Sequence, residues 1–582
     1  MKRTRLPLMW AALLCAATGL GPAACGDDGG ATEGGTESGT SDGGSGESDG
    51  GTSEGSDTVD GTSGGEEIEF TPAVGGLRRL MQAQYVDSIA VLLGGDAAAA
   101  AAAAGLPTDS ALHDFDAIGN AQLALTGTGV EDYELAATAA AGAAIGDLTR
   151  LATYVPCVVD GPQDAACYEA IAEEWGHLAW RRALSTEEVD RVRMIAEAAQ
   201  EWGAGDFLTG VKYELMALLQ SPHFLYMAEV GEPDPDDPTR MKLTPNELLT
   251  RMSFFLQGRT PDRQLIDVAE SGGLDTEEQI RSIANHMLSK PAARVALANF
   301  YDELLHLRDL PTIGKNPERF PQFGDALTDA MRESMLMLIE DIVWEQDADA
   351  RDIFMADHAF VNAPLAELYG VGAPMSGWDV ATLPAEHERA GFLGSAAFLA
   401  RFAHAEDTSP TRRGNFILGK FLCAEAPPPP ADVNPNLPEP DPDNPMTMKQ
   451  RLELHMQDDS CASCHGQMDP IGFALEHFDA IGQYRTEDFN SLPIDSFGEV
   501  EGLGSFSSPA EIGAVLLDDP RTAGCFVRNF ARGSMGHVET IGEEQMLLLI
   551  EEAFVEGGYS IQDLMVELVV SPVFRYVREP AE

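Results

Sequence analysis

Apolar side chains recur every three or four positions through most of this 582-residue chain. That spacing places them on one face of an α-helix, whereas the alternating pattern of a half-buried strand is scarce. Ser185 and Thr244 each open a capping box, and Gly258 can end the second of these helices. The clearest apolar stripes are Leu77, Met81, Tyr85, Ile89 and Leu92, and Leu327, Met331, Met335, Leu338 and Ile342. The chain is therefore predicted to be mainly α-helical.

The first 25 residues have the layout of a bacterial export signal. A basic start precedes an apolar stretch, residues 6–20, that is too short to span a bilayer. Small residues then lead to Cys25, which resembles the cysteine of a lipoprotein signal, so we predict a lipoprotein signal peptide over 1–25 and lipid attachment at Cys25. Cleavage after Ala24 without lipid attachment is the alternative. Gly26 follows the cysteine, and the lack of an aspartate there favours the outer membrane.

Residues 26–67 contain 12 acidic residues, no Lys or Arg, and almost no apolar side chain. Such a segment cannot bury a core, and its charges repel one another, so we predict a disordered stalk below a folded body. The signal contributes +3 and the stalk −12 to the formal charge of −58, which leaves −49 on the body. This charge repels phosphate backbones, so we exclude nucleic acid as a partner. Later apolar runs are too short to span a bilayer, and a lipid anchor is the one membrane contact that we expect.

Two Pro/Asp-rich segments and one weak repeat divide the body. Residues 231–238 are predicted to separate two helical subdomains, and residues 427–445 to form an extended, polyproline-like connector. The pattern Ser-Pro-x-Phe-x-Tyr occurs at 221–226 and again at 571–576. Each copy follows a helical run, so we expect a helix to end before each proline and each Phe to be buried.

The motif with chemistry of its own is C-x-x-C-H at residues 461–465. In c-type haem proteins the two thiols bond to the porphyrin, and the histidine ligates the iron. The motif predicts one haem c attached to Cys461 and Cys464, with His465 as the proximal iron ligand. A redox dithiol, half of a zinc site and a plain disulfide are the alternatives. A dithiol enzyme would need a βαβ context and a zinc site a second ligand pair, and the neighbouring sequence offers neither.

The wider block at residues 461–485, CASCHGQMDPIGFALEHFDAIGQYR, resembles part of a known family. The family consists of bacterial envelope proteins built from serial domains of unknown function, numbered 1587, 1595, 1592, 1588 and 1585. The resemblance implies a 1587-like domain at 68–145, a 1595-like domain at 146–230, a 1592-like domain at 239–375, a 1588-like domain at 388–486 and a 1585-like domain at 505–582. It thus implies a helical body of several subdomains, with the 1588-like part as a small c-type-haem-like module. No established reaction comes with it.

The ligand on the second side of the iron would decide between electron transfer and catalysis. His455, Met535 and His404 are the distal candidates, and an open position is the alternative. Met468 lies too close to His465 in sequence to reach the opposite face of a haem. A Met or His ligand would favour electron transfer, and an open position would favour small-molecule or peroxide chemistry.

Acidic residues follow the motif closely. Asp469, Glu476 and Asp479 lack the spacing of a calcium loop, so we do not expect calcium. We expect Asp469 to cap a helix and Asp479 to pair with Arg485. Glu476 or His477 is a candidate acid/base for peroxide chemistry.

Four further cysteines lie in the exported body. Cys157 and Cys167 are ten residues apart, and in an oxidising compartment a local disulfide is expected. A bridge between Cys423 and Cys525 would be long-range, and the alternative is two buried thiols.

Three functions remain open. The first is an envelope-anchored monohaem c-type cytochrome-like protein that transfers electrons or performs haem redox chemistry. Because the body is acidic, its redox partner would dock through a basic patch. The second is a non-catalytic surface or assembly protein with Cys461–Cys464 as a structural disulfide. The third, a hydrolase of cell-surface polymers, lacks a G-x-S-x-G or H-E-x-x-H motif.

Overall fold

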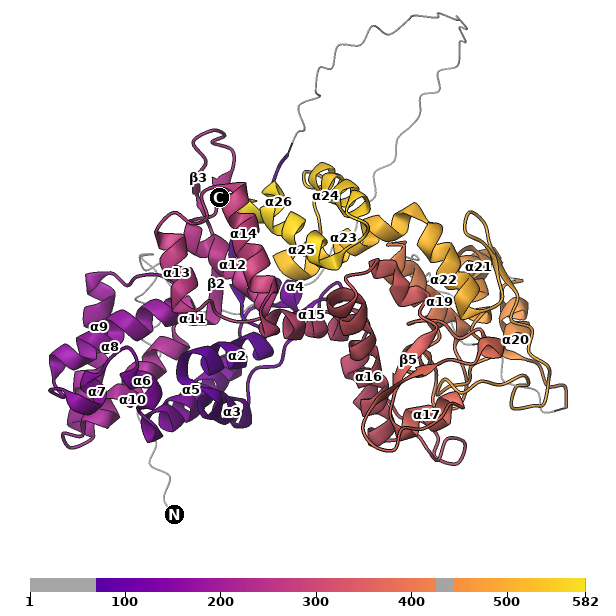
Figure 1. The fold of residues 1–582 in the computed structure, drawn as a ribbon, viewed down its shortest axis with the longest axis horizontal. Coiled ribbons are helices and arrows are strands. Elements are labelled where there is room, and N and C mark those ends of the chain that lie inside the picture. The colour runs from indigo at the N-terminus through magenta and orange to yellow at the C-terminus, as the bar shows by residue number, and fades with distance from the viewer. Residues whose placement is uncertain (1–69, 425–436, 438–442, 458, 581–582) are drawn as a thin grey trace, which may run out of the picture. The chain divides into compact units, whose positions relative to one another are not determined.

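The computed structural model describes residues 70–424, 437, 443–457 and 459–580. The predicted signal peptide with Cys25, the predicted stalk and most of the Pro-rich connector lie outside these ranges. Within the described residues the fold is mainly α-helical, with nine short strands in four small sheets (Figure 1). The predicted fold class is therefore confirmed. The described part of residues 67–582 forms one compact unit, and the domain boundaries inside it stay predictions.

The first part of the body is a set of helices with one antiparallel strand pair, β1 with β2. Its elements are β1 (Gly76–Arg79), α2 (Gln82–Leu93), α3 (Gly95–Ala104), α4 (Asp116–Gln122), α5 (Gly127–Gly146), α6 (Thr149–Ala152), α7 (Cys157–Asp160), α8 (Ala165–Trp180), α9 (Thr186–Trp202), α10 (Phe207–Gln220), α11 (Pro222–Leu225) and β2 (Tyr226–Glu229). Ser185 caps α9 with Glu188, as predicted. The expectation that the helical stripe begins at Leu77 was wrong, because residues 76–79 pair with β2 and Leu77 is exposed.

The middle part contains β3 (Glu232–Pro233), β4 (Met241–Lys242), α12 (Pro245–Gln257), α13 (Arg263–Glu270), α14 (Glu277–Leu288), α15 (Pro291–Leu304), η1 (Leu307–Thr312), α16 (Asp325–Glu340), η2 (Asp341–Glu345), η3 (Ala350–Phe354), β5 (His358–Val361), α17 (Ala363–Tyr369) and β6 (Asp379–Thr382). Thr244 caps α12 with Glu247, and Gly258 ends that helix in a left-handed conformation with φ 68°, as the sequence predicted. The stripe from Leu327 to Ile342 is buried, also as predicted.

The last part carries the C-x-x-C-H motif and the C-terminal helices. Its elements are η4 (Ala385–His387), α18 (Ala396–Arg401), α19 (Pro410–Phe421), α20 (Met448–His455), α21 (Asp459–Phe473), β7 (Gly498–Val500), β8 (Gly504–Phe506), α22 (Pro509–Asp518), α23 (Pro520–Met535), α24 (Glu544–Glu556), α25 (Ile561–Val570), α26 (Pro572–Arg575) and β9 (Tyr576–Val577).

The two Ser-Pro-x-Phe-x-Tyr segments adopt the same local structure. In each, a helix ends at the serine, the proline begins a four-residue helix, and a strand starts at the tyrosine. Phe224 and Phe574 are both fully buried, which confirms the expectation. A buried arginine donates to the carbonyl of each Phe, Arg181 to Phe224 and Arg251 to Phe574. The sequence repeat is therefore a repeated packing unit.

The C-terminal strand, β9, pairs with a strand that lies far earlier in the sequence. β9 pairs antiparallel with β4, which also pairs with β3. The predicted separator at residues 231–238 therefore contains one strand, β3, of a three-stranded sheet. The C-terminal helices are tied to α14 by ion pairs between Arg281 and Glu567 and between Arg575 and Glu277. Chain-distant segments thus share one core.

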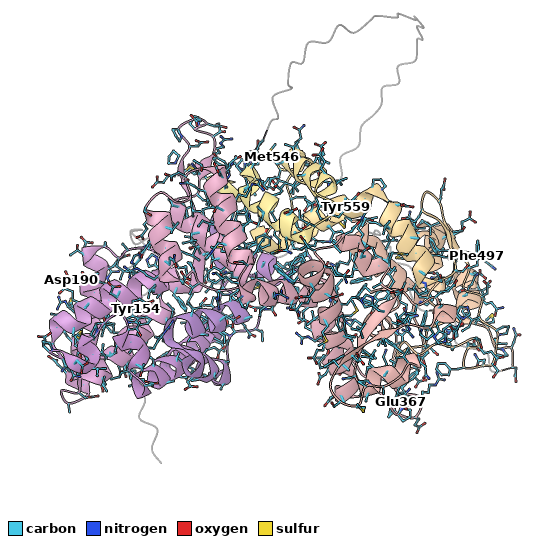
Figure 2. All side chains as sticks on the ribbon, in the orientation of Figure 1. Tyr154, Asp190, Glu367, Phe497, Met546 and Tyr559 are labelled. Atoms are coloured by element: carbon cyan, nitrogen blue, oxygen red, sulfur yellow. A yellow bond between two sulfur atoms is a disulfide. The ribbon has the colours of Figure 1, made fainter. Side chains whose placement is uncertain are left out.

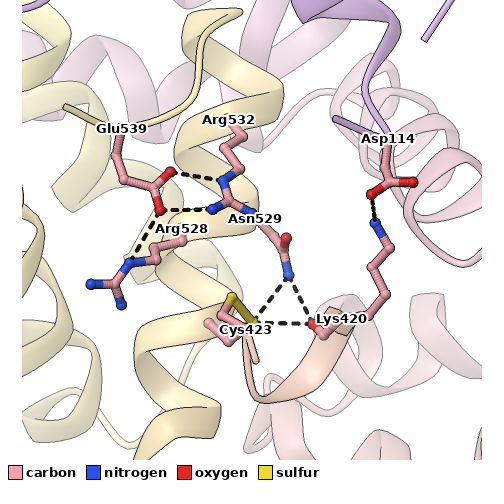
Figure 3. The surroundings of a disulfide bond; sticks show 8 residues. Asp114, Lys420, Cys423, Arg528, Asn529, Arg532 and Glu539 are labelled. Atoms are coloured by element: carbon pink, nitrogen blue, oxygen red, sulfur yellow. Dashed lines mark hydrogen bonds and ion pairs between the residues drawn. A yellow bond between two sulfur atoms is a disulfide. The ribbon is translucent and has the colours of Figure 1, made fainter. Parts of the chain in front are cut away.

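Two disulfides join the cysteines that the sequence singled out. Cys157 bonds to Cys167, and Cys423 bonds to Cys525, which links the end of α19 to α23. Beside the second bridge, Nδ2 of Asn529 donates to the Lys420 carbonyl at 2.9 Å, and Nζ of Lys420 lies 2.5 Å from a carboxylate oxygen of Asp114 (Figure 3). Helix α19 is therefore fastened to both the C-terminal helices and the N-terminal part.

Candidate functional site

The C-x-x-C-H motif lies on helix α21. Cys461 and Cys464 are one turn apart and His465 follows, so the three side chains share one helical face. Cys461 is buried, while Cys464 and His465 are partly exposed. Neither cysteine belongs to the Cys157–Cys167 or the Cys423–Cys525 disulfide. The face therefore presents two sulfur groups and one imidazole together.

The His465 ring is oriented by a buried carboxylate on the same helix. Nδ1 of His465 lies 2.9 Å from a carboxylate oxygen of Asp469, one turn further along α21. The other Asp469 oxygen accepts a hydrogen bond from Oγ1 of Thr411 at 2.7 Å. The hydrogen bond to Asp469 raises the pKa of His465, although partial burial opposes the shift. Because Nδ1 is engaged, Nε2 is the nitrogen available to ligate a metal.

The expectation that Asp469 caps a helix was wrong, because it lies inside α21 and is fully buried. Its role beside His465 could have been read from the sequence, since a four-residue spacing brings two side chains together on a helix. Thr411 could not, because it comes from α19.

Helix α21 packs closely against α19 through glycine. A side chain at Gly414 would lie 1.8 Å from the Met468 carbonyl oxygen, and one at Gly472 would lie 2.1 Å from the Pro410 carbonyl oxygen. Each helix therefore needs glycine where it touches the backbone of the other. This crossing fixes where the helical face with His465 lies.

The residues after α21 are held by a fully buried arginine. Arg413 donates to the carbonyl groups of Leu399, Leu475, Phe478 and Asp479 at 2.8 to 3.1 Å. Removal from water lowers the pKa of Arg413 to about 10, so it stays charged at neutral pH. Four carbonyl acceptors thus satisfy a charge that would be costly to bury alone.

The acidic residues of this block have separate structural partners. A carboxylate oxygen of Glu476 accepts from Thr408 at 2.9 Å and lies 3.3 Å from Arg485. Asp479 instead accepts from the backbone amides of Ile481 and Gln483, so the expected Asp479–Arg485 pair was wrong. Nδ1 of His477 lies 2.9 Å from the Arg485 carbonyl oxygen. Glu476 and His477 are therefore bound into the fold, and their acid/base role stays a prediction.

Of the distal candidates, His455 lies beside the motif. Its ring centre is 5.0 Å from that of His465, with the ring planes at 83°. His455 ends α20, and Nζ of Lys449 on that helix donates to the carbonyl of Phe497, the exposed ring labelled in Figure 2, at 2.8 Å. The two imidazole rings are thus in direct contact.

The other candidates lie elsewhere. Met535 is buried in the last turn of α23, and a side chain at Gly536, the next residue, would lie 3.0 Å from the Ala117 carbonyl oxygen. His404 lies exposed in the turn before α19. Met468 is buried against α19. Within the described chain, none of these three residues forms a hydrogen bond, ion pair or ring contact with His465.

The chemistry of the donor set fits a covalently attached haem. The two thiols are held one turn apart, and the imidazole beside them has its second nitrogen fixed by a carboxylate, as metal-ligating histidines usually do. Within the described ranges, no group of three or more His, Cys, Asp and Glu side chains is arranged to hold a metal ion by itself.

These features define an exported, disulfide-bonded and mainly helical protein with a C-x-x-C-H helix. The two disulfides indicate an oxidising environment outside the cytoplasm. Every helix among the described residues is too short or too polar to cross a membrane.

Comparison with family models gives four matches in series, each described as a protein of unknown function. They are DUF1587 at residues 78–146, DUF1595 at 167–229, DUF1592 at 243–371 and DUF1588 at 389–488. The chain belongs to the family of proteins that carry these domains in this order. The four matches end at residue 488, and the 1585-like domain at 505–582 stays a prediction. Searches among curated proteins and among solved structures found no match.

Proposed function

We propose that this chain is a lipid-anchored cell-envelope protein that carries one haem c and transfers electrons or performs haem redox chemistry. Cys461 and Cys464 hold the porphyrin through thioether bonds, and Nε2 of His465 is the proximal iron ligand. The lipid on Cys25 places the body at the outer membrane, facing the periplasm or the cell surface. When bound, the haem supplies a one-electron redox centre.

The observation that carries the proposal is the arrangement on α21. Two thiols and an imidazole share one face, and Asp469 fixes the imidazole through Nδ1 at 2.9 Å. An anionic partner on Nδ1 makes Nε2 more electron-rich, which strengthens it as a ligand. The oxidising environment that the disulfides indicate is also where c-type haem is attached.

The tethering of α21 supports redox function over a purely structural role. Asp469 is fully buried, and one of its carboxylate oxygens binds Thr411 while the other binds His465. These hydrogen bonds orient the partly exposed imidazole of His465, which a purely structural role would not require. Of the three distal candidates, His455 is the one whose ring contacts that of His465, with ring centres 5.0 Å apart.

The test is expression with a c-type haem maturation system and a pyridine haemochrome spectrum. We expect a c-type α-band in the purified protein and its loss in the Cys461→Ser/Cys464→Ser variant. A Cys157→Ser/Cys167→Ser variant is the matched control, since it removes a thiol pair elsewhere, and it should keep the band. A wild-type protein without a c-type band contradicts the proposal.

A second candidate is an assembly protein in which Cys461 and Cys464 form a disulfide. It is favoured by the fact that both other cysteine pairs of the described body are oxidised. Reduction followed by alkylation separates the two. Thioether-bound cysteines stay unmodified, whereas a disulfide gives two newly alkylated thiols at residues 461 and 464.

A further inference from the structure

A cavity of about 280 Å³ is lined by residues of the N-terminal, middle and C-terminal parts of the body. All of its lining residues come from 78–116, 254–308 and 530–565, so it is separate from helix α21. Its apolar wall includes the rings of Phe254, Phe255, Phe300 and Phe530. Its volume suits a ligand of about one ring, at the lower end of small-molecule sites.

A surplus carboxylate faces this cavity. Glu303 on α15 is 9% exposed, and its Oε1 accepts from the backbone amide of Asp116 at 2.5 Å. Arg308 lies 2.5 Å from Asp116 and 3.5 Å from Glu303, so one guanidinium serves two carboxylates. Within the described chain, the second oxygen of Glu303, Oε2, accepts no hydrogen bond. The side chain of Glu303, which is nine-tenths buried and lines the cavity, thus has one carboxylate oxygen without a donor.

The other charges of the wall have charged partners of their own. Arg78 shares Glu229 with Arg251, at 3.0 and 2.9 Å, and Arg332 holds Asp302 through two contacts of 2.6 and 2.8 Å. Asp109 lies 3.6 Å from Arg79 and accepts from Asn120 and from the backbone amide of Gln82. The cavity therefore combines aromatic rings with one carboxylate that lacks a full counter-charge, which is the chemistry that binds an organic cation.

We propose that this cavity binds a small amine with an aromatic or similarly apolar body, whose ammonium group donates to Oε2 of Glu303. The aromatic rings take the apolar body, and their negative faces attract the cation. The strongly acidic body raises the local concentration of cations near the entrance.

The acid–base properties of Glu303 support this assignment. Burial, the largest cause, and the nearby carboxylate of Asp116 raise the pKa of Glu303 to about 7, against the opposing effects of the Asp116 amide and of Arg308. Asp109 adds a smaller upward contribution. A bound cation favours the ionised carboxylate, so binding should strengthen as the pH rises through about 7.

The experiment is calorimetry on the full chain, using benzylamine as the cationic probe and benzyl alcohol as its neutral counterpart. We expect saturable binding of benzylamine at millimolar concentration, and at least about tenfold weaker binding of benzyl alcohol. Glu303→Gln keeps an oxygen that accepts from the Asp116 amide and removes the negative charge. It should therefore weaken the binding of benzylamine by about tenfold. Glu340→Gln, an exposed residue on α16 paired with Arg294, is the matched control and should bind as the wild type does.

Circular dichroism of the Glu303→Gln variant confirms that it is folded, and a benzylamine titration at pH 6 and 8 supplies an independent readout on the unchanged chain. Binding that is stronger at pH 8 supports the assignment. Absence of saturable binding, equal affinity for the alcohol, or an unchanged affinity in a folded Glu303→Gln variant would overturn it.

Discussion

Replacing Glu214 with methionine should stabilise this protein, and more so at pH 7 than at pH 5. Glu214 lies on α10 and is fully buried, and within the described residues neither of its carboxylate oxygens finds a hydrogen-bond partner. Desolvation raises its pKa well above the ordinary value of 4.5. The folded protein therefore holds a proton on Glu214 that the unfolded chain releases at neutral pH.

The magnitude follows from that difference in protonation. Keeping a carboxyl with an unfolded pKa of 4.5 fully protonated at pH 7 costs about 3 kcal/mol, which is the upper limit set by the unfolded chain. At pH 5 the cost falls below about 1 kcal/mol, because about a quarter of the unfolded chains then carry the proton. Since the folded pKa is raised, the wild type loses stability as the pH rises above 4.5, and a methionine of similar size has no such loss.

The assay is urea unfolding followed by circular dichroism at pH 5 and pH 7. At pH 7 we expect the free energy of unfolding of the Glu214→Met variant to exceed that of the wild type by up to about 3 kcal/mol. At pH 5 the difference should be smaller. Glu201→Met, at an exposed position on α9, is the control and should change stability by less than about 0.5 kcal/mol at either pH. A gain that does not depend on pH, or no gain at pH 7, would refute the reasoning.

Four further predictions concern the haem-type site and its attachment to the body. Cys423→Ser opens a bridge that spans 102 residues and should cost about 5 kcal/mol in urea unfolding, against about 3 kcal/mol for Cys157→Ser, whose bridge spans 10; equal losses would contradict the dependence on loop length. Gly414→Ala should lower stability by about 1–3 kcal/mol and reduce haem incorporation because it forces α19 from α21, whereas Gly419→Ala on the same helix, which has open space, should do neither. Asp469→Asn should keep the covalent haem but raise its reduction potential, since Nδ1 of His465 loses an anionic partner; an unchanged potential would remove that role from Asp469. Reduction by a basic redox protein should slow as salt is added, and a rate that ignores ionic strength would argue against docking by charge.

Local sequence signals predicted much of this fold. The helix starts at Ser185 and Thr244 and the end at Gly258 follow from capping, which involves residues three or four apart. The start of α2 was misplaced, because pairing with β2, about 150 residues later, overrides a local apolar stripe. Cysteine chemistry in an exported chain gave the pairing of Cys157 with Cys167.

The candidate sites show the same contrast between local patterns, which the sequence predicts, and long-range contacts, which it does not. The thiols and imidazole of α21 could be predicted because the motif is contiguous. Asp469 was found but given the wrong role, since its contact with Thr411 depends on how α19 and α21 cross. The carboxylate cavity could not be predicted, because Glu303 and Asp116 are 187 residues apart, and no sequence pattern joins them.

The most direct test of the central claim is mass spectrometry of the peptide that contains residues 461–465, after purification from cells that mature c-type haem. The account predicts that this peptide carries the added mass of one haem after full reduction, with neither Cys461 nor Cys464 open to alkylation. A peptide without the added mass, whose two cysteines are alkylated after reduction, would contradict it.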